Sequence, residues 1–340
     1  MNNGFKCAYF AELGKLLKKK RTLKLIISLA IIIVVFTLLF RFVYSLLEDV
    51  SGVALSEIEF ADTQEELDAL KAGYEEYKIA SENLTKNKLI DTTIYSYKAQ
   101  IAAGQFLVDN NISASSIRSF GTVSLSSNGY VLFMLDFITI VVVIYSIVAI
   151  GQLVGGELTE GVVKMELLRP IGRNELLSAK YLATLSFSTV LYLLLFVIIN
   201  IVGIIFFKVD VKDVLVVLDA SKAGLISPIG ELVLYFIQGL IIIISLVMLT
   251  TNVSVMLKKG ASVALPIVIF LIAGNIESML GYLYVGYAGI SINLEFLSAL
   301  TVSGPTFNYM SLFSMLAITI VYIAINTILA HVLFNRKDIQ

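Results

Sequence analysis

Six long runs of apolar residues divide the chain, and polar residues fall mainly between them. Each run approaches or exceeds the roughly 20 residues that a helix needs to cross the hydrocarbon core of a bilayer. The runs are continuous rather than alternating, which argues against membrane-spanning strands, and a helix satisfies its own backbone in lipid. The pattern predicts an all-α polytopic membrane protein with six transmembrane helices, at residues 23–47, 131–154, 181–207, 231–257, 261–281 and 312–334.

The composition is too apolar for an ordinary soluble domain. Of 340 residues, 58% are hydrophobic and 15% are charged, and the mean hydropathy is +0.89. The net charge of −1 conceals a sidedness, because basic residues gather at the connections on one side: Lys15, Lys18, Lys19, Lys20, Arg21, Lys164, Arg169, Arg173, Lys180, Lys258, Lys259, Arg336 and Lys337. The positive-inside rule then predicts that both termini are cytoplasmic. Frequent Ile, Lys and Asn favour a bacterium of low GC content, so we expect the membrane to be a bacterial cell membrane.

Residues 1–22 are predicted to form an amphipathic helix that lies at the cytoplasmic interface of the membrane. One apolar face is approximated by Phe5, Tyr9, Leu13, Leu16 and Leu17. The lysines that follow would contact membrane lipids, at about 1 kcal/mol for each basic residue near anionic headgroups. The alternative is that these lysines only fix the topology.

The largest polar segment, residues 48–130, is predicted to be an extracellular, mostly helical domain. Thr63 and Glu66 form a pattern typical of a helix start. Helical spacing follows at Leu67, Leu70, Tyr74 and Tyr77. A second helix is predicted at residues 92–108, and the stretch from 110 to 129, rich in Ser, Asn and Gly, is predicted to be a loop.

The other connections are shorter. Residues 155–180 are predicted to be a cytoplasmic loop, residues 208–230 an extracellular loop, and residues 335–340 a cytoplasmic tail. Residues 282–311 are apolar and rich in glycine but interrupted by Glu295 and Pro305. A re-entrant element fits this composition, because non-helical backbone at membrane depth must be shielded by protein.

No motif for catalysis or cofactor binding occurs in the sequence. There is no G-x-x-x-x-G-K-[ST] loop for nucleotide phosphates, no H-E-x-x-H and no G-x-S-x-G. His331 is the only histidine and has no cysteine or carboxylate near it in sequence, so a metal site is not expected. We therefore expect no enzyme activity, cofactor or metal on this chain, and no nucleic-acid partner.

Two charged residues fall inside the apolar runs. Arg41 and Asp136 are predicted to lie at a similar depth, near the outer side of the first two spans. A charge at mid-bilayer costs about 2.5–3.5 kcal/mol on insertion scales. Either the two residues pair, or Asp136 faces a conduit; the alternative is that they serve only helix packing or extend toward the interface.

The charged loop at residues 155–180 holds no set of nucleophiles or bases, so it suits docking better than chemistry. Glu157 and Glu160 are predicted to lie near a helix start, where carboxylates complement the helix dipole. Gly161 is expected to permit a close approach of backbones.

A short helix is predicted at residues 162–168, ending before Pro170 because the residue before proline disfavours α geometry. Lys164 adds positive charge to it. Arg169 and Arg173 can present their guanidinium groups to carboxylates on a partner. The alternative is a solvated loop whose arginines only satisfy the positive-inside bias.

The stretch GELTEGVVKMELLRPIGRNELLSAKYLA, residues 156–183, resembles the cytoplasmic loop of ABC-2 type ABC transporter permeases. The shared features are an acidic residue, a glycine, Leu-Leu-Arg-Pro-Ile-x-Arg and Lys-Tyr-Leu-Ala. The resemblance implies that the chain is a permease subunit with an N-terminal elbow helix and an outer re-entrant element. It also implies a coupling segment, which includes Glu157, Gly161, Arg169, Pro170 and Arg173.

By this resemblance the coupling segment docks on a separate cytoplasmic ATPase subunit, which binds the ATP. A second permease subunit, identical or different, would complete the pathway. Lipid, peptide, drug and ion all remain possible substrates. The rival hypothesis is a sensor or immunity protein, whose outer domain binds a peptide or antibiotic without transporting it.

Overall fold

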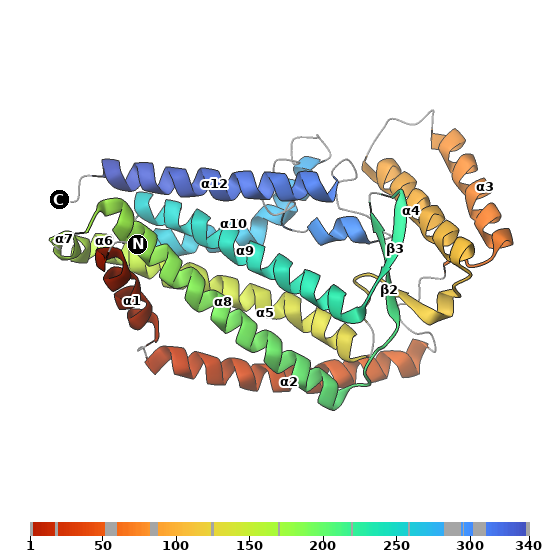
Figure 1. The fold of residues 1–340 in the computed structure, drawn as a ribbon, viewed down its shortest axis with the longest axis horizontal. Helices are drawn as coiled ribbons and strands as arrows, with labels where there is room; N and C mark the ends of the chain where they lie inside the picture. The colour runs from red at the N-terminus through yellow and green to blue at the C-terminus, as the bar shows by residue number, and fades with distance from the viewer. Residues whose placement is uncertain are drawn as a thin grey trace.

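The protein is an elongated bundle of helices with a small mixed unit at one end (Figure 1). The structure is a computed structural model that describes residues 3–17, 20–51, 60–81, 88–123, 126–168, 171–218, 220–257, 259–281, 294, 296–301 and 311–337. The helices α1 (Asn3–Leu17), α6 (Glu157–Thr159) and α7 (Val162–Leu167) lie at one end of the long axis, here called the α7 end. The helices α3 (Gln64–Ser81) and α4 (Lys88–Asn110) and the strands lie at the other, here called the sheet end.

Long apolar helices run side by side between the two ends (Figure 1). Four described helices are long and apolar enough to cross a membrane, so the chain is a multi-pass helical membrane protein. They are α5 (Ser127–Ile150), which continues through a π-helical turn η2 (Gly151–Gly156) into α6 (Glu157–Thr159), then α8 (Arg173–Phe206), α9 (Pro228–Met256) and α12 (Leu312–Arg336).

Two further helices contain shorter apolar stretches. They are α2 (Lys20–Ser51), with an apolar stretch at Ile31–Val43, and α10 (Lys259–Gly281), with one at Gly260–Ile272. These bounds agree with the predicted first and fifth spans to within a few residues. The total of six spans stays a prediction.

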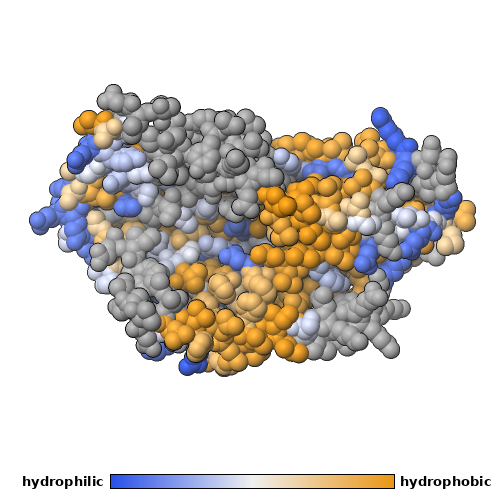
Figure 2. Space-filling model, turned by 180° about the vertical axis from the view of Figure 1, so that it is seen from behind, coloured by the Kyte–Doolittle hydropathy of each residue, from blue (hydrophilic) through white to orange (hydrophobic). Residues whose placement is uncertain are grey.

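The surface of the bundle is apolar over its middle. Figure 2 shows hydrophobic side chains gathered there and hydrophilic ones toward both ends. Val190, Ile205 and Ile320 are each more than half exposed. An exposed apolar area of this kind requires lipid or protein to cover it, which is the packing expected of membrane helices.

The centre of the bundle is the contact of α5, α8 and α9. Tyr192 of α8 is fully buried, its ring stacks on Phe236, and its hydroxyl lies 3.0 Å from the hydroxyl of Thr139 in α5. The ring fits because α9 carries Gly239 at this point: a Cβ there would overlap the Tyr192 hydroxyl and lie 2.6 Å from its Cζ. The absence of one side chain thus lets three helices meet.

The sheet end combines two helices with a small sheet. Helix α3 (Gln64–Ser81) packs on α4 (Lys88–Asn110). A 3-10 turn η1 (Ala114–Ser116) leads into strand β1 (Ile117–Ser119), which pairs in parallel with β2 (Asp213–Leu218); β2 pairs antiparallel with β3 (Lys222–Ile226).

The predicted start of α3 is confirmed. The hydroxyl of Thr63 accepts a hydrogen bond from the N–H of Glu66, and the carboxylate of Glu66 accepts one from the N–H of Asp62. These reciprocal bonds satisfy backbone donors that the first helical turn leaves open. The second predicted helix is also present, as α4.

The hairpin of β2 and β3 corrects the predicted extracellular loop at residues 208–230. Its signal is the β-branched run of β2, in which alternate residues face opposite sides. Leu215 and Val217 pack toward α4, whereas Val214 packs with Phe120 against η4 (Phe296–Leu300). Most of the predicted re-entrant element, residues 282–311, lies outside the described residues.

Replacing Gly239 by alanine should destabilise the bundle, because the new methyl group collides with the buried Tyr192. We expect the free energy of unfolding to fall by about 1–3 kcal/mol, the usual cost of overpacking a core. Thermal unfolding of the purified protein in detergent measures this.

Gly260→Ala is the matched control, since no atom lies within 4 Å of a Cβ at that position and alanine is the better helix former. Adding Tyr192→Phe to Gly239→Ala should recover part of the loss. Equal stability of Gly239→Ala and Gly260→Ala would contradict the close contact.

Candidate functional site

At the α7 end, helix α1 (Asn3–Leu17) packs against α8. The hydroxyl of Tyr9 donates a hydrogen bond of 2.8 Å to the hydroxyl of Ser186, and Leu16 is buried in the bundle core. The residues that face α8 therefore follow helical spacing. Leu17, predicted to belong to the apolar face, is instead 58% exposed.

A buried cluster of ion pairs lies where α1 meets the loop and α8. It contains two lysines and three glutamates: Glu12 and Lys15 from α1, Glu157 from α6, Glu166 from α7 and Lys180 from α8. The side chain of Lys180 is only 1% exposed and that of Glu12 only 3%. Water therefore reaches little of Lys180 and Glu12, whereas the side chain of Lys15 is 35% exposed.

Each lysine contacts all three glutamates. Lys15 Nζ lies 2.9 Å from Glu12 Oε1, 2.8 Å from Glu157 Oε1 and 2.7 Å from Glu166 Oε1. Lys180 Nζ lies 2.8 Å from Glu12 Oε1 and 2.9 Å from Glu166 Oε2, and also pairs with Glu157. We call these five residues the ion cluster.

Burial and charge act in opposite directions on the pKa values of the ion cluster. Burial raises the pKa of Glu12 above its ordinary value, although Lys180 and Lys15 oppose this. Burial also acts to raise the pKa of Glu166, but the charge and hydrogen bonds of Lys180 and Lys15 outweigh it, so that the pKa is lowered. Burial acts to lower the pKa of Lys15, yet the glutamates outweigh it and raise that pKa. Glu12 is thus the carboxyl that takes up a proton more readily, and its protonation would leave two lysines facing two carboxylates.

The three carboxylates could in principle hold a metal ion, because one oxygen of each lies within 4.8 Å of the others. The ammonium groups of Lys15 and Lys180 already lie against these oxygens. A cation would have to displace them. The arrangement is therefore that of a structural ion cluster.

The ion cluster holds α7 (Val162–Leu167) against the bundle. On the inner side of α7, Val163 is buried and Glu166 joins the ion cluster. On the outer side, Met165 is 64% exposed and Leu168 is 87% exposed, and Lys164 is exposed beside them. Two large apolar side chains thus project from a short helix whose opposite side is fixed.

Gly161 connects α6 and α7 for a different reason from the one predicted. No atom lies within 4 Å of where its Cβ would be, so no close backbone approach occurs. Its φ is +73° instead, a left-handed conformation that glycine adopts without the steric cost of a side chain. This turn sets the direction of α7.

The predicted role of Glu157 at a helix start is also wrong. Glu157 lies near the end of a continuous helical run that begins at Ser127 and ends at Thr159, so it lies near the negative end of the helix dipole. The lysines of the ion cluster compensate for this. Glu160 is exposed at the turn that follows.

Of the predicted arginines, one has an intramolecular partner. Arg173, the first residue of α8, donates hydrogen bonds to the backbone carbonyls of Asn335 and Lys337, at 3.1 and 3.3 Å. It therefore fastens the end of α12 to α8. Arg169 and Pro170 lie outside the described residues.

The predicted pair of Arg41 and Asp136 does not form. Both side chains are exposed on the bundle surface, and no ion pair joins them among the described residues. Asp136 lies in α5, which begins at Ser127. Because its side chain is exposed, it faces outward from a span. This exposure is compatible with a conduit or with a protein neighbour.

Sequence reasoning missed the ion cluster as a unit. Glu12 was not singled out, although it interrupts the helical face formed by Tyr9, Leu13 and Leu16. Lys180 was read only as part of the positive-inside bias, and Glu166 was not considered. An acidic residue on an apolar helix face is a signal that a cation must face it.

Residues 100–340, well over half of the chain, match a protein family described as "Protein of unknown function (DUF2705)". The matched part includes the four long apolar helices, the sheet and all of α7. No curated protein matches the chain. No solved structure matches it either.

Replacing Lys180 by methionine should strongly destabilise the protein, because three glutamates would then share one lysine. Removing one partner of a buried ion pair costs about 3–5 kcal/mol. Burial already raises the pKa of Glu12, and removing the opposing charge of Lys180 should raise it further in the folded state. A group with a raised folded pKa gains stability as the pH falls, so the deficit should be larger at pH 8 than at pH 5.

Unfolding in detergent at the two pH values measures this deficit. Adding Glu12→Gln to Lys180→Met should restore part of the stability by removing one negative charge. Lys164→Met is the exposed control and should change little. A deficit that is independent of pH and unaffected by Glu12→Gln would contradict the account.

Proposed function

The chain belongs to this family of unknown function, and we propose that it is the membrane-spanning permease subunit of an ATP-binding cassette exporter. In this proposal it forms one half of the translocation pathway, with both termini and the α7 end in the cytoplasm. A second permease subunit supplies the other half, and separate ATPase subunits bind the ATP. The observation that carries the proposal is the exposed apolar tip of α7, held from behind by the ion cluster.

The shape of the α7 tip suits a docking element. Met165 and Leu168 are far more exposed than apolar side chains that pack within a bundle. Apolar side chains at the centre of a contact, with charged residues such as Lys164 and Glu160 around them, match the composition of protein interfaces. A soluble partner with an apolar groove and a charged rim would cover this surface.

The ion cluster supplies a route for force from this tip into the membrane. Glu166 of α7, Glu157 of α6 and Glu12 of α1 all contact Lys180 of α8. A partner that pushes on α7 would therefore move α1 and α8 with it. The resemblance to the elbow helix and coupling loop of ABC-2 type permeases supports this reading.

ATP can change the state of the membrane helices only through unequal binding. A ligand shifts a two-state equilibrium by its differential affinity for the two states. The ATPase must therefore contact α7 differently when its nucleotide sites close. The exposed Asp136 and Arg41 lie on the bundle surface, where a second permease subunit or the pathway would face them.

The rival function is a sensor or immunity protein that holds its ligand outside the cell. The observation that favours this rival is a cavity at the sheet end, lined by charged and apolar residues, which would hold such a ligand. It differs from the permease proposal in needing no transported substrate. Ligand binding together with unchanged resistance in a strain whose ATPase is inactive would favour it.

Changing Met165 and Leu168 together to aspartate should abolish association with the ATPase. The two positions are exposed, so the fold should persist, but charged groups cannot enter an apolar groove without a large desolvation cost. Co-purification of the chain from its own cells with an ATP-binding cassette ATPase, identified by mass spectrometry, measures association, which should fall at least about tenfold, or 1.4 kcal/mol.

Ile79→Asp in α3 is the matched control, because Ile79 is 66% exposed at the sheet end. It should leave association unchanged. A Leu168→Cys variant in a Cys7→Ser background should also crosslink to the nucleotide-binding subunit, identified by mass spectrometry. Normal association of the double aspartate variant would count against docking at α7.

The orientation can be tested with the single cysteine of the chain. Cys7 is exposed at the α7 end, so in intact cells it should resist a membrane-impermeant maleimide and react after lysis. A Cys7→Ser, Ser221→Cys variant places the thiol in the exposed turn between β2 and β3 and should react in intact cells. The reverse pattern would invert the topology and remove the docking proposal.

A further inference from the structure

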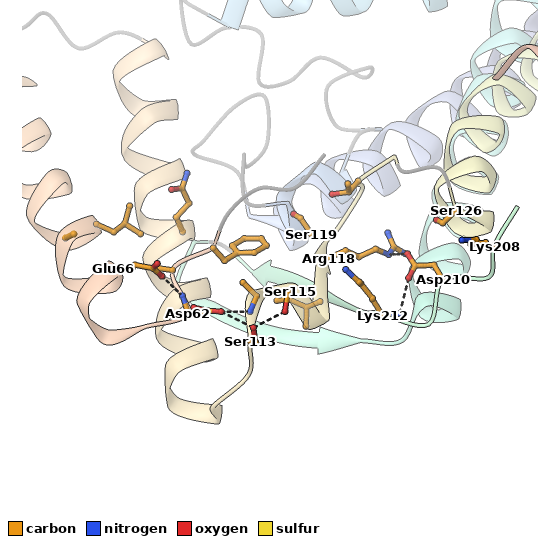
Figure 3. A pocket seen from close by; sticks show the side chains of 18 of the residues that line it. Asp62, Glu66, Ser113, Ser115, Arg118, Ser119, Ser126, Lys208, Asp210 and Lys212 are labelled. Carbon is orange, nitrogen blue, oxygen red and sulfur yellow. Dashed lines mark hydrogen bonds and ion pairs between the residues drawn. The ribbon is translucent and has the colours of Figure 1, made fainter. Parts of the chain in front are cut away.

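A polar cavity of about 960 Å³ lies at the sheet end, between α3 and α4 on one side and the segment that leads into β2 on the other (Figure 3). Its size is at the upper end of the 300–1,000 Å³ typical of small-molecule sites. Carboxylates alone stand at one end of it, and basic residues outnumber the single lining carboxylate, Asp210, at the other. Figure 3 shows Asp62 and Glu66 toward one end, and Arg118, Lys208 and Lys212 with Asp210 toward the other.

The basic end is built around a buried arginine. Arg118 of β1 is only 8% exposed, pairs with Asp210 at 3.1 Å through Nε and also pairs with the buried Glu231 of α9. Glu231 is fixed in turn by the N–H of Gly121 at 2.8 Å. Within the described residues, the Nη1 atom of Arg118 has no hydrogen-bond partner. This atom has almost no accessible surface, so Arg118 contributes its positive charge to this end and holds Asp210 in place.

Two exposed lysines stand at the same end. Lys208 and Lys212 both line the cavity and lie on either side of Asp210 in sequence. Asp210 is held by Arg118 and by the N–H of Lys212 at 3.0 Å. The two exposed ammonium groups, with the positive charge of Arg118 nearby, therefore favour an anionic group such as a carboxylate.

The acidic end is fixed in a similar way. The Asp62 carboxylate accepts hydrogen bonds from the N–H of Ala114 at 2.8 Å and the hydroxyl of Ser113 at 3.2 Å. Glu66 lies one turn further along the start of α3. No lysine or arginine pairs with either carboxylate among the described residues. A cationic group, such as an ammonium, would complete this end.

The wall between the two ends contains apolar side chains, among them Phe60, Leu70 and Ile117. The cavity thus has an acidic end, an apolar middle and a basic end. We propose that it binds a short zwitterionic peptide, with its amino terminus at Asp62 and Glu66 and its carboxylate at Lys208 and Lys212. A zwitterionic lipid headgroup fits less well, because its two charges lie next to each other.

This inference does not depend on an ATPase partner. The site holds its ligand by charge and shape alone, so binding occurs in the purified chain without ATP. Failure of the docking experiment at α7 would leave it standing. Failure of peptide binding would leave the docking proposal standing.

The test is calorimetric binding to the full chain in detergent. The probe is the peptide Ala-Leu-Ala-Leu with both ends free, compared with its N-acetylated and its C-amidated forms. We expect saturable binding of the free peptide with a Kd below about 1 mM. Each blocked form should bind about tenfold more weakly, because one end of the cavity loses its partner.

Variants of the exposed charged residues test which end of the cavity binds each terminus of the peptide. Glu66→Gln should weaken the free peptide about tenfold but leave the N-acetylated peptide unchanged. Lys208→Gln with Lys212→Gln should weaken the free peptide but leave the C-amidated peptide unchanged. These residues are exposed, so the fold should survive. Arg118→Gln is avoided as the main variant because it would break the buried pair with Glu231.

Glu75→Gln, on α3 but outside the cavity, is the matched control and should change nothing. Three results would overturn the proposal. One is no saturable binding of the free peptide at about 5 mM. Another is equal binding of the free and blocked peptides. The third is displacement of the peptide by inorganic phosphate or glycerophosphoethanolamine, which would identify an anion or headgroup site instead.

Discussion

The structure of the α7 end depends on one constraint: a lysine buried in a membrane protein must remain surrounded by carboxylates. Lys180 is almost inaccessible to water, and a charge in that position is tolerated only when paired and hydrogen-bonded. Its partners come from α1, α6 and α7, and α1 is far from the other two in sequence. Separating these helices would leave the buried charge of Lys180 without a partner. This is why a short helix with a glycine turn can have a fixed direction.

The local sequence pattern predicts the long helices but not the side-chain contacts that join them. The positions of α5, α8, α9 and α12 follow from continuous apolar runs, although α8 begins at Arg173, within the predicted loop at residues 155–180. The start of α3 follows from a two-residue capping pattern. The ion cluster could not be predicted in this way, because Glu12 and Lys180 are separated by 168 positions and either one alone resembles an interfacial charge. The sheet was missed because β2 is short and borders apolar spans. Gly161 was correctly selected, but a sequence does not tell a left-handed turn from a close contact.

The two ends of the molecule use the same device for different purposes. At the sheet end, Arg118 is buried against Asp210 and Glu231; at the α7 end, Lys180 is buried against three glutamates. At the α7 end both lysine nitrogens have carboxylate partners on other helices. At the sheet end the pairs of Arg118 join β1 to α9 and to the segment before β2, beside a cavity. The first arrangement holds elements together, and the second borders the proposed position for a ligand.

Helix α8 connects these two arrangements directly. It carries Lys180 near its first residues and leads, after Phe206, into Lys208 and Asp210 at the cavity. Its 34 residues span about 50 Å at 1.5 Å per residue. A rigid element with a fixed contact at each end can couple two sites if it has two arrangements that both sites bias. If α8 has two such arrangements, the proposed ligand at Lys208 and Lys212 and the proposed partner at α7 act on the same helix. By linkage, the ligand would then change the affinity for the partner by the same factor as the partner changes the affinity for the ligand.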